Sequence, residues 1–468
     1  MIKFILVSAS FCAFTLSVSV LLLATTKLVN NVDHSPLQFS DPTTLNHLVF
    51  AIASSEKSWP RRKEYTKLWW NNHNIGIRGC VFVDNLPNND TNSNSNSSSS
   101  LLPPLCVSED TSKFRFTYPS SLGGYRDTIR LTRLLKEIVA LHHSDVRWYV
   151  FCDDDTVFLM ENLLKTLSKY DHRLWYYIGA NTEMYEQARY FSFAMAFGGG
   201  GFALSAPLAK VLAKHFDSCI ERYHYLYGSD GRFYHCITEL GISLTREPGF
   251  HQVDLRGNIF GLLAAHPLTP LISLHHPETT DPIFPNMTRI RAYQHLFEAV
   301  EFDPQRVLQQ TVCYDNRSSW TVSVSWGYAV QVFHNNMPLP EALKVLKTFK
   351  QWNEEAKRAT ERIYNFNTRE VHHDPCKRPS VFYLDKVAYG TNKDFIISNY
   401  KKSYQNCSHD MPTKKLEVIK VVTNKLDLDI KQLQNPRRHC CDVLPSRAGE
   451  MMEVAIRECK DEEMIYMH

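Results

Sequence analysis

Three consecutive aspartates, Asp153, Asp154 and Asp155, are the residues of this chain whose types and spacing point most directly to chemistry. They end an apolar, aromatic and β-branched run over residues 147–152, which predicts a buried strand that carries the acids to the carboxyl edge of a sheet. Adjacent carboxylates repel one another unless a cation lies between them, and such hard oxygen ligands suit Mg²⁺ or Mn²⁺. The run therefore predicts a divalent metal with open positions for a phosphate, as in a nucleotide-sugar diphosphate site.

The acids have two other interpretations. An isolated Asp cluster after a strand is usually a solvated turn, although the apolar run before this one favours a buried setting. The spacing of Asp153, Asp155 and Val157 also fits the Asp-x-Asp-x-Thr/Val pattern of haloacid-dehalogenase-type phosphatases, in which the first acid is the nucleophile. In those enzymes the pattern lies on the first strand, whereas here it lies well inside the folded region.

The elements around the acids are expected to position a ligand. Residues 48–55 predict a first buried strand that ends in small residues, so that Ala53 and Ser54 would let a ligand ring approach the backbone closely. A helix is predicted over residues 61–70. Within it, Arg62 is a candidate for contact with a diphosphate, and a solvated position on the helix surface is the alternative.

The order of the predicted elements indicates an α/β fold. A second strand is predicted over residues 76–84, and an amphipathic helix over residues 127–142 leads directly into the acidic strand. Strand, helix and strand in succession favour a parallel sheet with a right-handed crossover. Between them, residues 88–100 consist almost wholly of Asn, Ser, Thr and Asp, which predicts a disordered surface insertion.

A run of four glycines at residues 198–201 is a second candidate for ligand contact. Apolar segments flank it, and a capping Ser205 followed by Pro207 predicts the start of a helix. Glycine lets the backbone turn tightly and approach a bulky ligand, so Gly200 and Gly201 are expected to line the site. A flexible linker is the alternative.

One acid, Asp230, lies between two glycines in a loop that Cys219 and Cys236 flank and could join by a disulfide. Without the surrounding pattern, a turn or helix N-cap would be the better interpretation. Further along, His251 and His275 lie at the ends of predicted strands. A neutral imidazole there could join carboxylates on a metal, and an ordinary core or surface histidine is the alternative.

The C-terminal residues, 314–468, show no pattern typical of catalysis. They predict strand structure over residues 320–333 and a helix over residues 339–358. Six cysteines, counted from Cys313, indicate a disulfide-rich accessory module.

Length and composition are those of a large folded protein. Of 468 residues, 44% are hydrophobic and 12% aromatic, enough for about two or three domains with a sizeable core. A net charge of +3 over this length gives no basic surface for nucleic acid. An uncharged apolar stretch over residues 4–26 is long enough to cross a bilayer, so we expect an uncleaved anchor, with a cleaved signal peptide as the alternative.

Two further features predict that the folded part lies in an oxidising compartment. All glycosylation sequons follow the apolar stretch, at Asn89, Asn96, Asn286, Asn316 and Asn406. The twelve cysteines include no Cys-x-x-Cys pair, which favours disulfides over zinc. Setting aside Cys12 in the anchor and Cys152 in the buried strand leaves an even number of cysteines, as a disulfide framework requires.

Taken in order, these motifs resemble the fringe-like β-1,3-glycosyltransferases, and most closely their plant fringe-related branch. The resemblance rests on the anchor, the first strand, Trp148-Tyr-Val-Phe-Cys-Asp-Asp-Asp-Thr-Val-Phe, Gly198-Gly-Gly-Gly-Phe-Ala-Leu-Ser, Gly228-Ser-Asp and Ser273-Leu-His-His. It covers residues 48–302. It implies a GT-A fold, a UDP-sugar donor, Mn²⁺ dependence and a single-pass type II protein of the Golgi membrane with its catalytic domain in the lumen.

The resemblance also implies roles for single residues. Asp153 and Asp155 match the acidic motif that binds metal and donor, with Asp155 as the direct Mn²⁺ ligand, and Asp154 is expected to contribute to donor binding. His275 matches the late histidine that completes the metal site, and His251 is the alternative.

Asp230 matches the general base of the family. The chain departs from fringe proper at Gly228-Ser229-Asp230, where fringe has paired acids, and throughout the C-terminal region. The donor and acceptor sugars therefore stay open. The expected reaction is an inverting single displacement, in which Asp230 removes the proton of the attacking acceptor hydroxyl on a glycan or glycoconjugate. The non-enzyme alternative is a lumenal lectin-like or scaffolding protein that has the fold without turnover.

The expected organisation has four parts. Residues 1–27 form a cytoplasmic tail and transmembrane signal-anchor, residues 28–46 a stem, residues 47–305 the GT-A domain, and residues 306–468 a C-terminal accessory region.

Overall fold

The computed structural model describes residues 42–70, 76–87, 102–119, 121, 125–352, 363–404, 407, 411–444 and 450–466. From Thr43 to His468 the chain forms one compact unit. The expected anchor, most of the stem and the polar insertion over residues 88–100 lie outside the described residues. Within the described part, no helix combines the length and the apolar character needed to cross a membrane.

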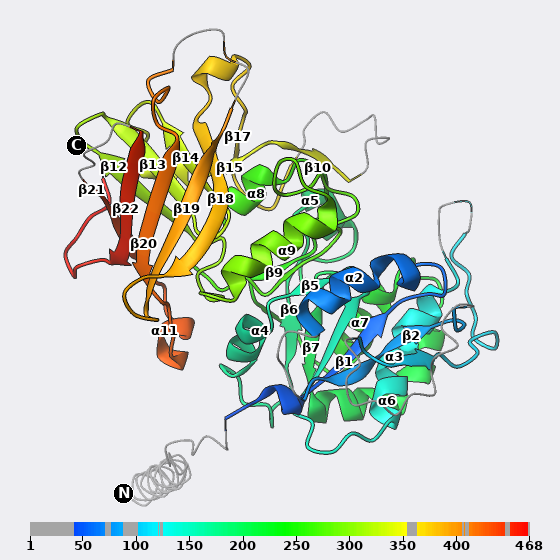
Figure 1. Cartoon of the computed structure of the whole chain (residues 1–468). Coiled ribbons are helices and arrows are strands. Elements are labelled where there is room, and N and C mark those ends of the chain that lie inside the picture. The colour runs from blue at the N-terminus through cyan, green and yellow to red at the C-terminus, as the bar shows by residue number, and fades with distance from the viewer. Residues whose placement is uncertain are drawn as a thin grey trace, which may run out of the picture. The chain divides into compact units, whose positions relative to one another are not determined.

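The first sheet has seven strands in the order β3-β2-β1-β4-β7-β6-β8 (Figure 1). Its strands are β1 (Leu48–Ala53), β2 (Arg78–Val83), β3 (Leu105–Val107), β4 (Trp148–Asp153), β6 (Tyr177–Gly179), β7 (Phe202–Ser205) and β8 (Leu244–Arg246). Strand β1 is parallel to both β2 and β4, as the strand–helix–strand order predicts. Strand β7 is antiparallel to β4 and β6, so the sheet is mixed and only partly parallel. The predicted α/β class is confirmed.

The continuous apolar runs of β1 and β4 have a simple cause, because both faces of these central strands are buried. Alternate residues belong to two separate apolar clusters, one with Phe50 and Val150 and the other with Ala51 and Phe151. Helices α3 (Thr128–Ala140), α6 (Ala206–Arg222) and α7 (Ser229–Glu239) pack against one another and contribute to the second cluster.

The remaining helices of this part are α2 (Trp59–Trp70), α4 (Met160–Leu167), α5 (Tyr185–Tyr190), α8 (Phe260–Ala264) and α9 (Arg289–Val300). Helices α2 and α3 lie where the sequence predicts them. The start of α6 differs in one detail, because Ser205 is its N-cap residue but its hydroxyl accepts a hydrogen bond from the Tyr176 backbone N–H instead of capping the helix.

A small three-stranded sheet joins distant parts of the chain next to the end of β4. Its order is β5 (Val157–Phe158), β11 (Ser273–Leu274) and β9 (Phe250–His251). Leu274 pairs with Val157 on one side and with His251 on the other. Since β5 begins one residue after the three aspartates and His275 directly follows β11, this pairing brings the late histidine to the acids.

The C-terminal residues form an eight-stranded sheet in the order β12-β13-β14-β18-β19-β20-β22-β21 (Figure 1). Its strands are β12 (Gln310–Asp315), β13 (Trp320–Ser325), β14 (Ala329–Phe333), β18 (Ser380–Tyr389), β19 (Phe395–Ser403), β20 (Val418–Asn424), β21 (His439–Leu444) and β22 (Met451–Glu458). The predicted strand structure over residues 320–333 is a hairpin of β13 and β14, which turns at Gly327 with a φ of 77°.

The helix predicted over residues 339–358 is wrong for its described residues. Only α10 (Leu339–Ala342) is helical, and it is followed by β15 (Val345–Leu346) and β16 (Phe349–Gln351). Strand β15 pairs with β17 (Thr368–Arg369), and β16 pairs with β10 (Leu255–Gly257). Backbone hydrogen bonds to distant strands thus outweigh the local helical spacing. A last helix, α11, covers Ile430–Gln434.

The cysteine count is confirmed by five disulfides. They join Cys80–Cys106, Cys219–Cys236, Cys313–Cys441, Cys376–Cys407 and Cys440–Cys459. Cys152 is free and buried, as its place in the acidic strand predicts, while Cys12 lies outside the described residues. The predicted link between Cys219 and Cys236 ties α6 to α7 and so holds the helix that carries Asp230.

Candidate active site

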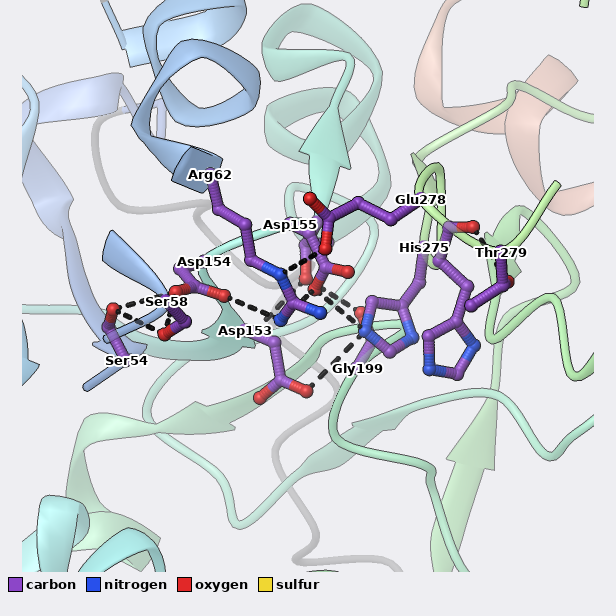
Figure 2. A network of polar contacts seen from close by, with 12 residues as sticks. Ser54, Ser58, Arg62, Asp153, Asp154, Asp155, Gly199, His275, Glu278 and Thr279 are labelled. Atoms are coloured by element: carbon purple, nitrogen blue, oxygen red, sulfur yellow. Dashed lines mark hydrogen bonds and ion pairs between the residues drawn. The ribbon is translucent and has the colours of Figure 1, made fainter. Parts of the chain in front are cut away.

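The turn after β4 presents the three acids in different directions (Figure 2). Thr156 holds this turn, since its Oγ1 accepts a hydrogen bond of 3.0 Å from the Asp153 backbone N–H. The same hydroxyl donates to the carbonyl oxygen of Gly199 at 2.7 Å. One side chain therefore connects the acidic turn to the glycine run.

Asp153, Asp155 and His275 form a cluster whose ligand atoms all lie within 4.8 Å of one another. Nε2 of His275 lies 3.1 Å from Oδ1 of Asp155 and 3.4 Å from Oδ2 of Asp153. Its Nδ1 lies 3.2 Å from the carbonyl oxygen of Gln252, which suits a proton on Nδ1 and leaves Nε2 as the ring nitrogen that faces the carboxylates.

The donor set of this cluster fits a divalent cation. Asp155 is buried, yet neither of its carboxylate oxygens accepts a hydrogen bond of good geometry from the described residues. A buried carboxylate without hydrogen-bond donors is unfavourable unless positive charge lies beside it. His275 and Arg62 lie 3.1 Å and 3.4 Å from Oδ1 of Asp155, and Oδ2 accepts no hydrogen bond from the described residues. The side chain of Asp153 is 41% exposed, so the cluster also has a side open to a ligand.

The electrostatics of the cluster favour a positive charge. Burial alone would lower the pKa of His275, but the neighbouring carboxylates of Asp155 and Asp153 raise that pKa to about 10. Burial would raise the pKa of Asp155, and the charges of His275 and Arg62 instead hold it below its usual range. A position where acids stabilise an imidazolium this strongly is also one where they would stabilise a bound cation.

Asp154 points away from the cluster into a buried network (Figure 2). Its Oδ2 accepts hydrogen bonds from the hydroxyls of Ser54 at 2.7 Å and Ser58 at 2.6 Å. Arg62 donates to its Oδ1 at 3.0 Å, and donates from Nε to Glu278 at 2.8 Å. The network fixes the end of β1 and the start of α2 beside the acids. No local pattern in the amino-acid sequence indicates the part of Ser58 or Glu278 in it.

Ala53, the other small residue expected near the donor, is the last residue of β1 and is paired in register with Asp153. It thus lies beside the exposed acid of the cluster. Contact of Ala53, Ser54, Arg62 and Asp154 with a donor stays a prediction.

The glycine run is a tight turn with protein groups packed against it. Gly201 donates from its backbone N–H to the carbonyl oxygen of Gly198 at 2.9 Å and has a φ of 85°. A Cβ at Gly199 would lie 2.0 Å from Cε1 of His275, and one at Gly198 would lie 2.5 Å from Oδ1 of Asp230. The first two glycines are therefore required by the site's own side chains.

The other two glycines are buried in the protein. Gly200 donates from its backbone N–H to Oε1 of Gln252 at 2.7 Å, and a Cβ at Gly201 would lie 2.7 Å from the ring of Phe158. Ligand contact by Gly200 and Gly201 stays a prediction.

Asp230 lies in the first turn of α7, after the N-cap residue Gly228, so the segment expected to be a loop is the start of a helix. Its carboxylate is half-buried and faces the glycine run. Burial raises the pKa of Asp230 to about 6, against the hydrogen bonds from the Gly198 backbone and the Ser229 hydroxyl. A carboxylate of this basicity is suited to accept a proton near neutral pH.

His251, the alternative metal ligand, lies outside this cluster. Its Nδ1 is 3.1 Å from Oε1 of the buried Glu183, and its ring centroid is 5.1 Å from that of His266. Of the two histidines, only His275 lies with the acids.

An aromatic group that includes Tyr227, just before the helix that carries Asp230, was missed in the sequence. We call Tyr118, Tyr190, Phe191, Phe193 and Tyr227 the aromatic rim. Tyr227 lies 5.3 Å from Tyr118 and 6.3 Å from Phe191, measured between ring centroids. Tyr190 and Phe193 are 68% and 56% exposed. The density of aromatic residues just before the glycine run was the available signal.

Comparisons with known proteins place the chain in a family. Residues 187–441, more than half of the chain, match the family described as "Protein of unknown function, DUF604", so the chain belongs to that family. No curated protein sequence matches it.

Two solved structures are similar to parts of the chain. One is the glycosyltransferase GlyE of Streptococcus pneumoniae TIGR4, at 11% identity and a TM-score of 0.29, over 44% of this chain and 45% of that one. The other is mouse xyloside xylosyltransferase 1 in its apo form, at 9% identity and a TM-score of 0.27, over 42% of this chain and 81% of that one. The chain thus spans less than half the length of the first.

Proposed function

We propose that this protein is an inverting glycosyltransferase of the fringe-like type, which moves a sugar from a UDP-sugar to a hydroxyl of a glycan or glycoconjugate in a β-1,3 linkage. The observation that carries the proposal is the cluster of Asp153, Asp155 and His275 at the carboxyl end of β4. The buried carboxylate of Asp155, which accepts no hydrogen bond of good geometry from the described residues, supports a cation there, and Asp230 would supply a base across the glycine run.

Asp155, Asp153 and His275 would hold the metal, which the family resemblance suggests is Mn²⁺. A bound dication supplies charge neutralisation for the departing UDP. The protein's own contribution is to fix these ligands before the donor arrives. Burial immobilises Asp155, and the carbonyl oxygen of Gln252 orients the imidazole of His275.

Asp230 would act as the general base. Its carboxylate accepts the proton of the acceptor hydroxyl while that oxygen attacks the anomeric carbon of the donor. With a pKa of about 6 the group is mostly ionised at neutral pH. A single displacement needs only this one base, since no glycosyl-enzyme intermediate is formed.

The aromatic rim supports a carbohydrate acceptor. Tyr227 lies next to Gly228, the N-cap of the helix that begins with Ser229 and Asp230, and through Phe191 it is continuous with the exposed ring of Tyr190. Aromatic faces bind the apolar faces of sugar rings without excluding their hydroxyls from water. The rim would therefore hold the acceptor beside the base.

The test is turnover by the purified full-length protein against a panel of UDP-sugars, measured as UDP release with Mn²⁺. We expect release from at least one donor, loss of it in Asp155→Asn, and no change in the exposed control Asp461→Asn. A folded wild-type protein that binds glycan but releases UDP from no donor would contradict the enzyme and favour the lectin-like alternative.

We also infer a Golgi membrane protein of type II, anchored by residues 4–26. The support is the pairing of ten cysteines in disulfides, which fits the secretory lumen. An anchored protein should stay with membranes after an alkaline wash, and a mature N-terminus beyond residue 26 would contradict the anchor.

A further inference from the structure

A cavity of about 730 Å³ lies in the C-terminal part of the chain, formed by residues of β14 and β18, of β15 and β17, and of the start of α8. We call it the β14–β17 cavity. Strands β14 and β18 are neighbours in the middle of the eight-stranded sheet, and Figure 1 shows β15, β17 and α8 beside β18. Its volume is in the range of pockets that hold small molecules or one to a few sugar rings.

The cavity contains a cation, Arg369, that has no close ion-pair partner among the described residues. The guanidinium of Arg369 lies 4.9 Å from the centroid of Phe333, and its Nε is buried without a hydrogen-bond partner. Within the described part of the chain the guanidinium makes no close ion pair, and the charge of Glu341 acts on it only from a longer distance. A half-buried guanidinium is unfavourable unless an anion meets it, and its planar fork fits a carboxylate with two parallel hydrogen bonds.

A second unpartnered donor lies in the same wall. Gln331 is only 3% exposed, and its Nε2 has no hydrogen-bond partner. It stands two residues before Phe333 on β14, so both side chains lie on the same face of the sheet. A buried amide nitrogen left without an acceptor indicates a ligand oxygen at this position.

The charge and shape of the lining agree with an acidic sugar. Its basic residues are Arg369, Lys377 and Arg378, with His334 and His372 nearby in the wall, whereas its one acid, Glu370, is paired with Lys347 at 2.7 Å. Phe260, Phe333 and Tyr383 give it aromatic walls, against which the apolar face of a sugar ring can pack.

We propose that the β14–β17 cavity binds a uronic acid residue of a glycan, with the sugar carboxylate on Arg369, a ring oxygen or hydroxyl on Gln331 and the ring against the aromatic walls. That the ligand carries a carboxylate is inferred from the residues of the cavity alone. That the ligand is a sugar rests on the proposed function. The accessory region would thereby hold an acidic glycan on the enzyme.

The experiment compares an acidic ligand with its methyl ester, which has the same sugar rings and linkages but no free carboxylate. Binding of a galacturonic acid trisaccharide and of its methyl ester to the full-length protein is measured by calorimetry, without donor and without metal. We expect the acid to bind at least ten-fold more tightly than the ester, since a bidentate charged pair is lost in the ester. Equal affinity for the two, or no binding of the acid, would overturn the proposal.

Variants locate the site. Arg369→Met keeps an aliphatic stem over Phe333 and should weaken binding of the acid at least ten-fold. The control variant Arg317→Met, at an exposed position outside the cavity, should leave the affinity unchanged. Gln331→Leu is a second probe in case Arg369→Met fails to fold, and it should also weaken binding. A folded protein of either variant that keeps wild-type affinity would refute the site.

Two controls separate the parts of the proposal. If acetate or inorganic phosphate competes as strongly as the trisaccharide, the sugar assignment is wrong. Asp155→Asn should retain binding, because the cavity shares no residue with the acidic cluster. Failure of sugar transfer is thus distinguishable from failure of this inference.

Discussion

Gly199 is the position at which one methyl group tests the candidate active site most sharply. A Cβ there would lie 2.0 Å from Cε1 of His275, whereas ordinary van der Waals contact begins at 3.4 Å. In Gly199→Ala, the imidazole or the glycine turn must therefore move by about 1.4 Å, the difference between these distances.

The imidazole has little freedom to swing aside. His275 is 3% exposed, its Nδ1 lies 3.2 Å from the Gln252 carbonyl oxygen, and its ring centroid is 3.7 Å from that of His276. The movement would displace Nε2, which now lies 3.1 Å from Asp155. Since misplacement by about 1 Å can reduce activity roughly 10²-fold, we expect Mn²⁺ affinity to fall on the order of 10- to 100-fold and sugar transfer at least as much.

The assay is a calorimetric titration of Mn²⁺ into Gly199→Ala and into a matched control, Gly228→Ala. A Cβ at Gly228 would meet nothing within 4 Å, and its φ of −116° is open to alanine. The control should keep wild-type metal affinity although it lies beside Asp230. Equal Mn²⁺ affinity in the two folded variants would refute the placement of His275 on the metal.

The other predictions concern the base and the acceptor. Asp230→Asn keeps the shape of the side chain but cannot accept a proton, so transfer should fall on the order of 10²- to 10⁴-fold while UDP affinity is retained; full activity would make Asp230 only a helix-start residue. Because the base must be ionised and its pKa is raised to about 6, the transfer rate should be level at neutral pH and fall about ten-fold per pH unit below 6; a rate independent of pH down to 4 would contradict this role. Tyr190→Ala and Phe193→Ala should raise the KM for the acceptor several-fold, with the KM for the donor unchanged, and a change confined to the donor would rule out the rim as acceptor site.

The parts of the fold that could be predicted are those with strong local patterns. Strand β4 is apolar on both faces because it lies between β1 and β7 in the middle of the sheet, and the run of residues 147–152 carries that information. The even number of cysteines that remains without Cys12 and Cys152 predicts a disulfide framework, and five disulfides are present. The structure also brings Asp153, Asp155 and His275 together, and their role as metal ligands stays a prediction.

The parts that could not be predicted depend on contacts between distant segments. Arg62 meets Glu278 across 216 residues, and no pattern near either residue indicates the pair. The helical spacing after residue 342 is overridden because Phe349–Gln351 pairs with Leu255–Gly257. The direction of Asp154 likewise depends on distant residues, Ser54 just after the neighbouring parallel strand β1 and Ser58 in the turn before α2, whose hydroxyls donate to it.

The most direct test of the account is the affinity of the full-length protein for UDP with and without Mn²⁺, measured by calorimetry. If Asp155 and His275 are metal ligands, UDP should bind when Mn²⁺ is present. A chelator should then abolish UDP binding, and added Mn²⁺ should restore it. The same UDP affinity in chelator as in Mn²⁺ would contradict the metal site and the mechanism built on it.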